Sequence, residues 1–283
     1  MLSKELIKHF ESLLSEEVKS TKHLSGGDIN EVFLLSTSTR ELVVKLNSAS
    51  RFPKMFETEA KGLQELRKVN GFRVPKVLGY GECNDDSFLT LEYIKTGKKT
   101  RNFWRMFGIQ LADLHSHSAS YFGFESDNYI GSLPQYNSKD SSAARFYITQ
   151  RLQPQFAMAI KRGFSFPNLD SFYTAVENEI PNEPSSLIHG DLWSGNFMVD
   201  VNSYPCLIDP TVAYAPREMD IAMMNLFGGF DEEVFEVYND IFPLTNDWKE
   251  RLPLWQLYYL LVHLNLFGKS YYNSVRGILN RYS

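Results

Sequence analysis

The chain has 283 residues, of which 43% are hydrophobic and 22% charged, the composition of an ordinary globular protein. The formal net charge is −5 and no long run of like charges occurs, which argues against a nucleic-acid partner. The two cysteines, Cys83 and Cys206, fit no metal-binding spacing, so we expect free thiols in a reducing compartment.

The sequence predicts no targeting or membrane-spanning segment. Its first residues lack the continuous apolar run of a signal peptide and instead repeat apolar residues at helical spacing. The most apolar stretch, residues 252–267, is short for a bilayer span and contains Gln256, His263 and Asn265. We therefore expect a buried helix there, and a cytoplasmic protein without a membrane partner.

Residues 1–94 are predicted to form a strand-rich unit. Apolar spacing predicts helices over residues 4–18 and 53–69. Branched and aromatic residues predict strands over residues 21–24, 31–36, 41–46, 76–80 and 87–94. The polar segment 95–101 contains a glycine and is typical of a linker.

Helical patterns dominate residues 95–283. They predict helices over residues 103–115, 143–162, 169–178, 217–226, 232–241 and 248–267. One hairpin interrupts them at residues 196–209, with its turn at residues 200–203. A small antiparallel sheet followed by a larger helical unit gives an α+β fold with two lobes, which we expect to divide after Ile94.

The strongest chemical signal is the segment His189-Gly-Asp-Leu-Trp-Ser-Gly-Asn196, which places Asp191 five residues before Asn196. The kinase catalytic loop H-R-D-x-x-x-x-N has the same spacing, with Gly190 here in place of arginine. In that loop the aspartate accepts the proton of the attacking hydroxyl and the asparagine binds a metal ion. We expect His189 to orient the loop through hydrogen bonds rather than to transfer protons.

A second carboxylate is expected at the same site. Asn196 precedes the first strand of the predicted hairpin and Asp209 ends the second. Because those two positions lie side by side in an antiparallel hairpin, both side chains reach one end of it. An amide and a carboxylate oxygen there could hold Mg²⁺ against phosphate oxygens.

The N-terminal unit supplies an expected ion pair. Lys45 lies in the predicted strand Leu42-Val-Val-Lys-Leu46, like the lysine of a V-A-I-K strand that contacts the α and β phosphates. Glu59 in the following helix is its expected partner. Glu57 is the alternative, because the pattern leaves the register of that helix open.

A glycine-containing turn is the weakest of the signals. Gly26 and Gly27 begin a segment that ends at Asn30 between two strands, where backbone N–H groups can approach phosphate. Each part alone has an ordinary explanation: a tight turn, a solvated lysine, or an Asp-Pro turn. Their order along the chain is the order that phosphoryl transfer needs, and chance rarely arranges six such parts in sequence.

These residues resemble the fructosamine kinase family. The segment Leu187-Ile-His-Gly-Asp-Leu-Trp-Ser-Gly-Asn196 carries much of the likeness. Matching segments also occur at residues 26–30, 122–135, 151–155, 217–223, 226–230 and 257–268. The resemblance covers nearly the whole chain. Its H-G-D part is shared with aminoglycoside and choline kinases, whereas Trp193-Ser-Gly and Leu226-Phe-Gly-Gly-Phe230 are more specific to this family.

The resemblance implies a protein-kinase-like fold, with residues 1–94 binding nucleotide and residues 95–283 forming the catalytic and substrate lobe. It implies an ATP- and Mg²⁺-dependent kinase that phosphorylates a sugar hydroxyl, expected to be O3, of a free or protein-bound ketosamine. Such phosphorylation makes the adduct unstable and so repairs the glycated amine. The protein could be a monomer or a homodimer.

Roles for individual residues follow by analogy with the family. Asp191 would be the catalytic base, and Asn196 and Asp209 the magnesium ligands. The remaining expected nucleotide-binding residues are Gly26, Gly27, Asn30, Lys45 and Glu59 at the phosphates, with the backbone of Glu92, Tyr93 and Ile94 at the adenine. With the hydroxyl proton leaving late in the reaction, Asp191 would need no unusual pKa.

Two departures from the family pattern are visible. Ala215-Pro216 stands where relatives often have Gly-His, so the substrate side of the pocket is expected to differ. Asp28 stands where some relatives have a cysteine, so no redox switch is expected in that loop. Two other readings stay open: a kinase for an aminoglycoside, choline or a simple sugar, and a non-catalytic ATP-binding sensor.

Overall fold

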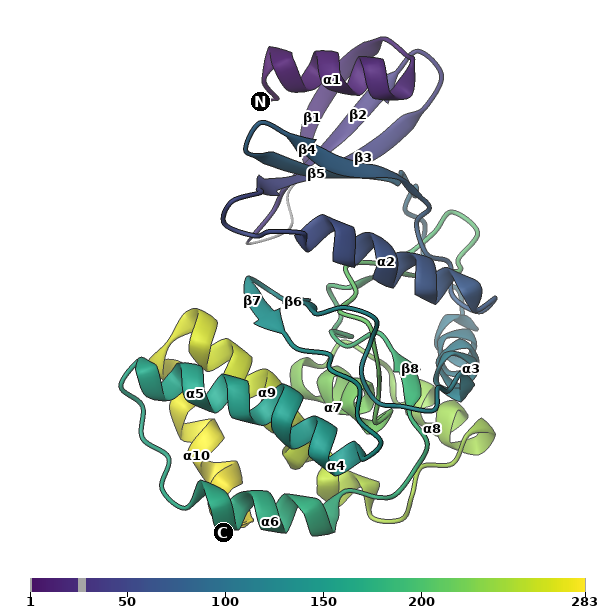
Figure 1. Cartoon of the computed structure of the whole chain (residues 1–283). Helices are drawn as coiled ribbons and strands as arrows, with labels where there is room; N and C mark the ends of the chain where they lie inside the picture. The colour runs from purple at the N-terminus through teal and green to yellow at the C-terminus, as the bar shows by residue number, and fades with distance from the viewer. Residues whose placement is uncertain (1, 25–28, 283) are drawn as a thin grey trace.

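The computed structural model describes residues 2–24 and 29–282, which form a small sheet-containing part stacked on a larger helical part (Figure 1). The first part contains a five-stranded antiparallel sheet in the order β1-β2-β3-β5-β4. Its strands are β1 (Val18–Leu24), β2 (Glu31–Thr37), β3 (Glu41–Ser48), β4 (Val77–Cys83) and β5 (Asp86–Glu92). The predicted α+β class with a small antiparallel sheet is confirmed.

Two helices cover the opposite faces of this sheet (Figure 1). Helix α1 (Lys4–Leu14) packs Leu6 and Phe10 onto one face, where Val44 and Phe88 belong to the same buried cluster. Helix α2 (Met55–Lys68) packs on the other face and lies between the sheet and the helical part. Side chains alternate between faces along a strand, so alternate residues of β3 point toward α2.

The first helix is shorter than its sequence pattern predicts. The prediction of a helix over residues 4–18 is wrong after Leu14, because Ser15 adopts a left-handed backbone with φ 54°. The carboxylate of Glu11 then accepts the backbone N–H of Val18 at 3.1 Å, and β1 begins there rather than at residue 21.

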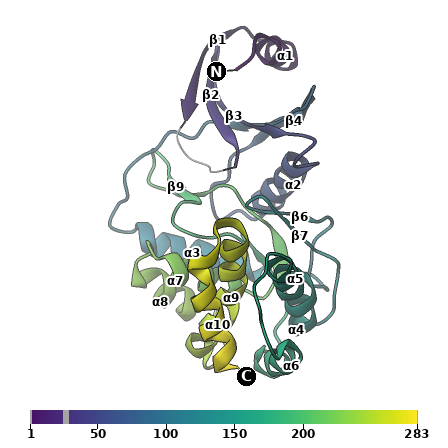
Figure 2. The same cartoon turned by 90° about the vertical axis from the view of Figure 1, so that its left-hand side faces the viewer.

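The helical part is built around one long buried helix. Helix α9 (Trp248–Phe267) lies between α5 and α7 in both views (Figures 1 and 2). The other helices are α3 (Phe103–Ser116), α4 (Ala143–Phe146), α5 (Gln153–Lys161), α6 (Leu169–Glu179), α7 (Glu218–Phe227), α8 (Glu232–Ile241) and α10 (Tyr272–Arg281). Across the described residues, none of the helices has the length and apolarity to cross a membrane.

Two features of this part depart from the sequence-based expectation. The helix predicted over residues 143–162 contains a π-helical segment, η1 (Tyr147–Leu152), between α4 and α5. The final helix, α10, follows the 3₁₀ turn η2 (Lys269–Tyr271) and was not predicted.

The expected free thiols are confirmed, since Cys83 and Cys206 form no disulfide. The division of the chain after Ile94 stays a prediction.

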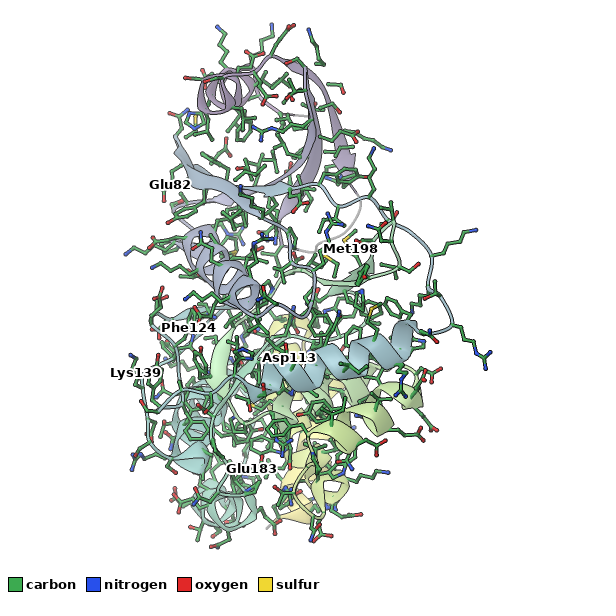
Figure 3. All side chains as sticks on the ribbon, turned by 90° about the vertical axis from the view of Figure 1, so that its right-hand side faces the viewer. Glu82, Asp113, Phe124, Lys139, Glu183 and Met198 are labelled. Atoms are coloured by element: carbon green, nitrogen blue, oxygen red, sulfur yellow. The ribbon has the colours of Figure 1, made fainter. Side chains whose placement is uncertain are left out.

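Short strands complete the helical part. Strands β6 (Asn128–Ile130) and β7 (Leu133–Gln135) form one hairpin, which was not predicted. The predicted hairpin at residues 196–209 is present as β9 (Phe197–Val199) paired with β10 (Pro205–Leu207). Figure 3 shows Met198 of β9 in the region between the sheet and α3. Strands β8 (Ser186–Ile188) and β11 (Ala213–Ala215), which precede and follow this hairpin, pair with each other.

Candidate active site

Two nested hairpins bring the predicted catalytic residues together. Because β8 pairs with β11 and β9 pairs with β10, the loops at residues 189–196 and 208–212 must run side by side. Backbone hydrogen bonds join them: the Thr211 N–H donates to the His189 carbonyl at 2.9 Å. At the other end of the loops, the Ile208 N–H donates to the Asn196 carbonyl at 3.0 Å.

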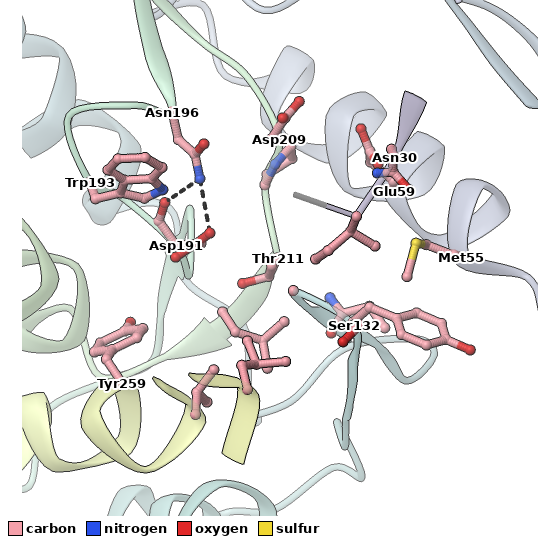
Figure 4. Close-up of a pocket in the computed structure, with 18 of the residues that line it drawn as sticks. Asn30, Met55, Glu59, Ser132, Asp191, Trp193, Asn196, Asp209, Thr211 and Tyr259 are labelled. Atoms are coloured by element: carbon pink, nitrogen blue, oxygen red, sulfur yellow. Dashed lines mark hydrogen bonds between the residues drawn. The ribbon is translucent and has the colours of Figure 1, made fainter. Parts of the chain in front are cut away.

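Asp191 lies at the centre of the first loop. The side-chain amide of Asn196 donates to the Asp191 carbonyl at 2.8 Å and to its carboxylate Oδ2 at 2.9 Å (Figure 4). Burial raises the pKa of the Asp191 carboxyl to about 7, and the nearby charges of Asp209 and Asp220 act in the same direction. We expected Asp191 to need no unusual pKa, but burial of the carboxyl raises its pKa above the ordinary value for aspartate.

Lys45 reaches the same site from the sheet. Val43 and Lys45 point from β3 toward the α2 side, where the Lys45 ammonium contacts Glu59 at 2.7 Å and Asp209 at 3.1 Å. Burial disfavours the ammonium, but the carboxylates of Asp209 and Glu59 outweigh it and raise the pKa of Lys45 above its usual value. The alternative partner, Glu57, instead pairs with Lys61 at 3.0 Å.

Asp209 holds an uncommon backbone conformation. Its φ of 54° lies in the left-handed region that non-glycine residues rarely occupy. Such conformations cost about 1–3 kcal/mol and cluster at functional sites. The paired strands on either side hold the residue in this state, with its carboxylate facing Lys45 across the gap between the sheet and the helical part.

Asp220 of α7 supports the loop at residues 189–196, and the sequence analysis gave it no role of its own. Its fully buried carboxylate accepts the backbone N–H of His189 at 2.7 Å and of Gly190 at 2.9 Å. A ring nitrogen of His115 lies 3.2 Å from the same carboxylate. The sequence did contain a signal for this role: Asp220 is an acidic residue within the apolar run of α7. A carboxylate buried at such a position needs hydrogen-bond donors from neighbouring segments.

His189 itself is buried and holds the two loops together. Its Nε2 lies 2.9 Å from the Ile208 carbonyl, and its Nδ1 accepts the backbone N–H of Asp191 at 3.3 Å. Burial lowers its pKa, so the ring is neutral and donates through Nε2. These contacts agree with the expected orienting role.

Gly190 is required by the close approach of the second loop. Its φ is +84°, and a Cβ built there would lie 2.2 Å from the Thr211 carbonyl oxygen. We expect Gly190→Ala to lower the free energy of unfolding by at least about 1–3 kcal/mol, measured by urea denaturation. Gly277→Ala is the control, because nothing lies within 4 Å of its Cβ position and alanine favours its helix. Equal stabilities of the two variants would contradict this account.

A cavity of about 520 Å³ joins these groups. Figure 4 shows Asp209 between Asp191 on one side and Asn30 and Glu59 on the other. Toward the sheet, the cavity is lined by Ile29, Asn30, Lys45, Met55, Thr58 and Glu59. Toward the helices, it is lined by Asp191, Trp193, Asn196, Met223, Phe227, Tyr259, Val262, His263, Leu266 and Phe267. Residues 209–211 and the β6–β7 hairpin residues 128–132 complete its wall.

Not every predicted residue is brought to this cavity. Gly26 and Gly27 lie outside the described residues. Glu92, Tyr93 and Ile94 do not line it, and the Glu92 carboxylate is engaged by Arg73 at 2.8 Å. Any contact of that segment with a nucleotide would therefore use its backbone. Within residues 2–24 and 29–282, no cluster of three or more His, Cys, Asp or Glu side chains is arranged for a metal ion.

Together, the two-part fold, the Lys45–Glu59 pair and the Asp191 loop agree with the kinase arrangement that the sequence predicted. The fold agrees with that of the aminoglycoside phosphotransferase APH(4)-Ia, with a TM-score of 0.66 at 14% identity over 100% of both chains. The model of the fructosamine kinase family matches residues 2–283, and the chain belongs to this family. It is accordingly a phosphotransferase with a hydroxyl group as acceptor.

Individual relatives agree with this assignment. An Enterococcus faecium protein named "probable ketoamine kinase" is 38% identical over 91% of this chain and 93% of its own length. The chloroplastic protein-ribulosamine 3-kinase of Arabidopsis thaliana is 34% identical over 92% of this chain and 81% of its own. A crystal structure assigned as a fructosamine-3-kinase from Haemophilus somnus superposes with a TM-score of 0.89 at 28% identity, covering 99% and 97% of the two chains.

Proposed function

We propose that the protein transfers the γ-phosphoryl group of ATP, in the presence of Mg²⁺, to the O3 hydroxyl of a ketosamine. One observation carries the proposal: Asp191, Asn196, Asp209 and the Lys45–Glu59 pair converge on one cavity between the sheet and the helices. The names of the relatives support the acceptor class, since they are called ketoamine and ribulosamine kinases.

Asp191 is proposed as the base that accepts the proton of the attacking hydroxyl. A carboxyl group whose pKa lies near neutrality is suited to this role at physiological pH. The Asn196 amide fixes one carboxylate oxygen, which leaves the other for the substrate hydroxyl. Holding base and hydroxyl in this geometry supplies much of the rate enhancement.

The Lys45–Glu59 pair is proposed to bind the phosphates of the nucleotide. Glu59 and Asp209 hold the Lys45 ammonium where the α and β phosphates would bind. Gly26, Gly27 and Asn30 would cover the phosphates, and the backbone of residues 92–94 would contact the adenine. Breakdown of the O3-phosphorylated product would then release the amine.

The oxygen donors fit a magnesium ion. The Asn196 amide nitrogen is directed to Asp191, so its oxygen remains available beside the Asp209 carboxylate. Amide and carboxylate oxygens are ligands that Mg²⁺ prefers, and the ion keeps several waters and phosphate oxygens as further ligands. When bound, Mg²⁺ would neutralise charge on the transferring phosphoryl group.

Asp209→Asn is expected to weaken Mg·ATP binding by roughly tenfold or more, because it removes one anionic ligand. Titration calorimetry with ATP, in the presence and absence of Mg²⁺, measures the effect. Asp240→Asn, an exposed substitution on α8, is the matched control. Unchanged Mg²⁺ dependence in the Asp209 variant would remove this residue from the metal site.

The acceptor class is tested by ADP release over a panel of acceptors: ketosamines, free hexoses, choline and aminoglycosides. We expect turnover with ketosamines, together with phosphorus NMR showing phosphate on O3. Preferential turnover of another acceptor would replace the ketosamine assignment while keeping the kinase. ATP binding without turnover on any acceptor would favour a nucleotide sensor instead.

A further inference from the structure

One half of the active-site cavity is aromatic. Phe227 ends α7, and a stripe of α9 at helical spacing, residues 259, 262, 263, 266 and 267, faces the cavity beside it. We use the term aromatic rim for Trp193, Phe227, His263 and Phe267. Three of its members stay strongly exposed: Trp193 by 40%, Phe227 by 39% and Phe267 by 55%.

Three rings of the rim, those of Phe227, His263 and Phe267, are packed together. The His263 ring lies 4.8 Å from that of Phe227 and 5.4 Å from that of Phe267, measured between centroids. The Nδ1 of His263 lies 2.8 Å from the Tyr259 carbonyl and donates to it in the neutral ring. Burial lowers the pKa of His263, so this ring adds no positive charge. Exposed apolar rings held in this way mark a binding surface rather than a core.

Charge in the cavity is distributed unevenly. Among the described residues that line it, Lys45 is the only lysine or arginine, and Glu59 and Asp209 already hold its ammonium. The carboxylate of Asp191 lies beside Trp193 at the start of the aromatic rim (Figure 4). Bound ATP would add further negative charge. A substrate carboxylate in this cavity would therefore meet like charge and no free cation.

The proposed reaction fixes which part of the acceptor meets the rim. With O3 of the sugar at Asp191, the ketosamine nitrogen lies only a few bonds away. Because the sheet side of the cavity holds the proposed phosphate-binding groups, we place the substituent of that nitrogen toward the helical side, across from the β6–β7 hairpin. In the adduct of an α-amino acid, the carboxylate is attached next to that nitrogen. It would then have to enter an aromatic, cation-free surface, where an unpaired charge is costly.

From this, and resting on the proposed function, we infer that the aromatic rim selects ketosamines whose nitrogen carries an uncharged apolar substituent. Adducts with a carboxylate next to the nitrogen are disfavoured. The discrimination against the carboxylate arises from the missing partner for its charge. Stacking on the rings favours apolar substituents with and without the carboxylate alike. Adducts of alkyl or aromatic amines, or of a side-chain amine far from any carboxylate, satisfy the condition.

The test compares fructose adducts of phenylalanine and of phenylalanine amide, in which a carboxamide replaces the carboxylate. The phenethylamine adduct is a third acceptor, because it lacks the carboxylate but keeps a basic amine. We expect kcat/KM for the phenylalanine adduct to be at least about tenfold lower than for the amide, since like-charge contacts cost several kcal/mol. Equal values for the two would overturn the inference while leaving the kinase assignment intact. No phosphorylation of any of the three would overturn the proposed function and the inference with it.

Two pairs of variants assign the effect to the rim. Phe267→Lys and Phe227→Lys each add a cation at an exposed helix end. We expect either variant to lower, several-fold, the ratio of kcat/KM for the amide adduct to kcat/KM for the phenylalanine adduct. Phe267→Gln and Phe227→Gln remove the same rings without adding charge and should leave the ratio between the phenylalanine adduct and its amide unchanged. If this kcat/KM ratio stayed the same in both lysine variants, the rim would not be the source of the discrimination against the carboxylate.

Discussion

Asp191→Asn is expected to lower kcat by about a hundredfold to ten-thousandfold, the usual contribution of a general base, while ATP affinity changes little. Asparagine has nearly the same shape, and its carbonyl oxygen can still accept the hydrogen bond from the Asn196 amide at the 2.9 Å position. It has no oxygen basic enough to take the hydroxyl proton. The loss should therefore appear in turnover and not in folding or nucleotide binding.

Single-turnover kinetics and ATP titration of the same protein preparation separate these effects for Asp191→Asn. Asp240→Asn, with an exposed side chain on α8, makes the same chemical change away from the cavity and should keep full activity. Near-normal turnover of the Asp191 variant would exclude this residue as the base. Loss of ATP affinity equal to the loss of turnover would point to a binding role.

Asp220→Asn is expected to lower both stability and turnover. The buried carboxylate of Asp220 accepts two backbone N–H groups of the catalytic loop, from His189 and Gly190. An asparagine can accept one of them, but its amide nitrogen faces the other and leaves it unpaired. Leaving a buried donor unpaired costs about 1–3 kcal/mol, and the displaced loop would carry Asp191 away from its position.

Urea denaturation and kcat at saturating substrates, measured well below the unfolding transition, distinguish the two consequences of Asp220→Asn. Asn225→Ala, on the exposed side of the same helix, should change stability by no more than about 0.5 kcal/mol. Full turnover in the folded fraction of the Asp220 variant would mean that the loop holds its shape without this residue. In contrast, Asp191→Asn should leave the denaturation midpoint almost unchanged.

The predicted hairpin shows why part of the site was accessible from sequence. Its two strands, separated by a polar turn, carry their own pairing information, and the position of Asp209 beside Asn196 follows from antiparallel geometry. The choice between Glu57 and Glu59 could not be made this way. It depends on which side of α2 faces the sheet, and only the packing of the helix decides it.

The missed strands differ in the signal that they carry. The hairpin of β6 and β7 has a local signal that was overlooked, the two-residue turn Gly131-Ser132 with Gly131 at φ 58°. Strands β8 and β11 have three residues each and lie far apart in the sequence, so their pairing exists only in the folded chain. Helix α1 ends before its apolar spacing does because of a left-handed residue, Ser15. Asp220 lies in the segment 217–223 that resembles the family, but its hydrogen bonds to residues 189 and 190 form only in the folded chain.

The nested pairing of β8 with β11 around β9 with β10 has a mechanical consequence. Asp191, Asn196 and Asp209 all lie in the loops that connect these four strands, so we expect them to move together. Lys45 belongs to the sheet and meets them only through its 3.1 Å contact with Asp209. A change in the separation of the sheet and the helical part would therefore alter the Lys45–Asp209 distance, while the spacing between the proposed base and the proposed magnesium ligands would stay constant.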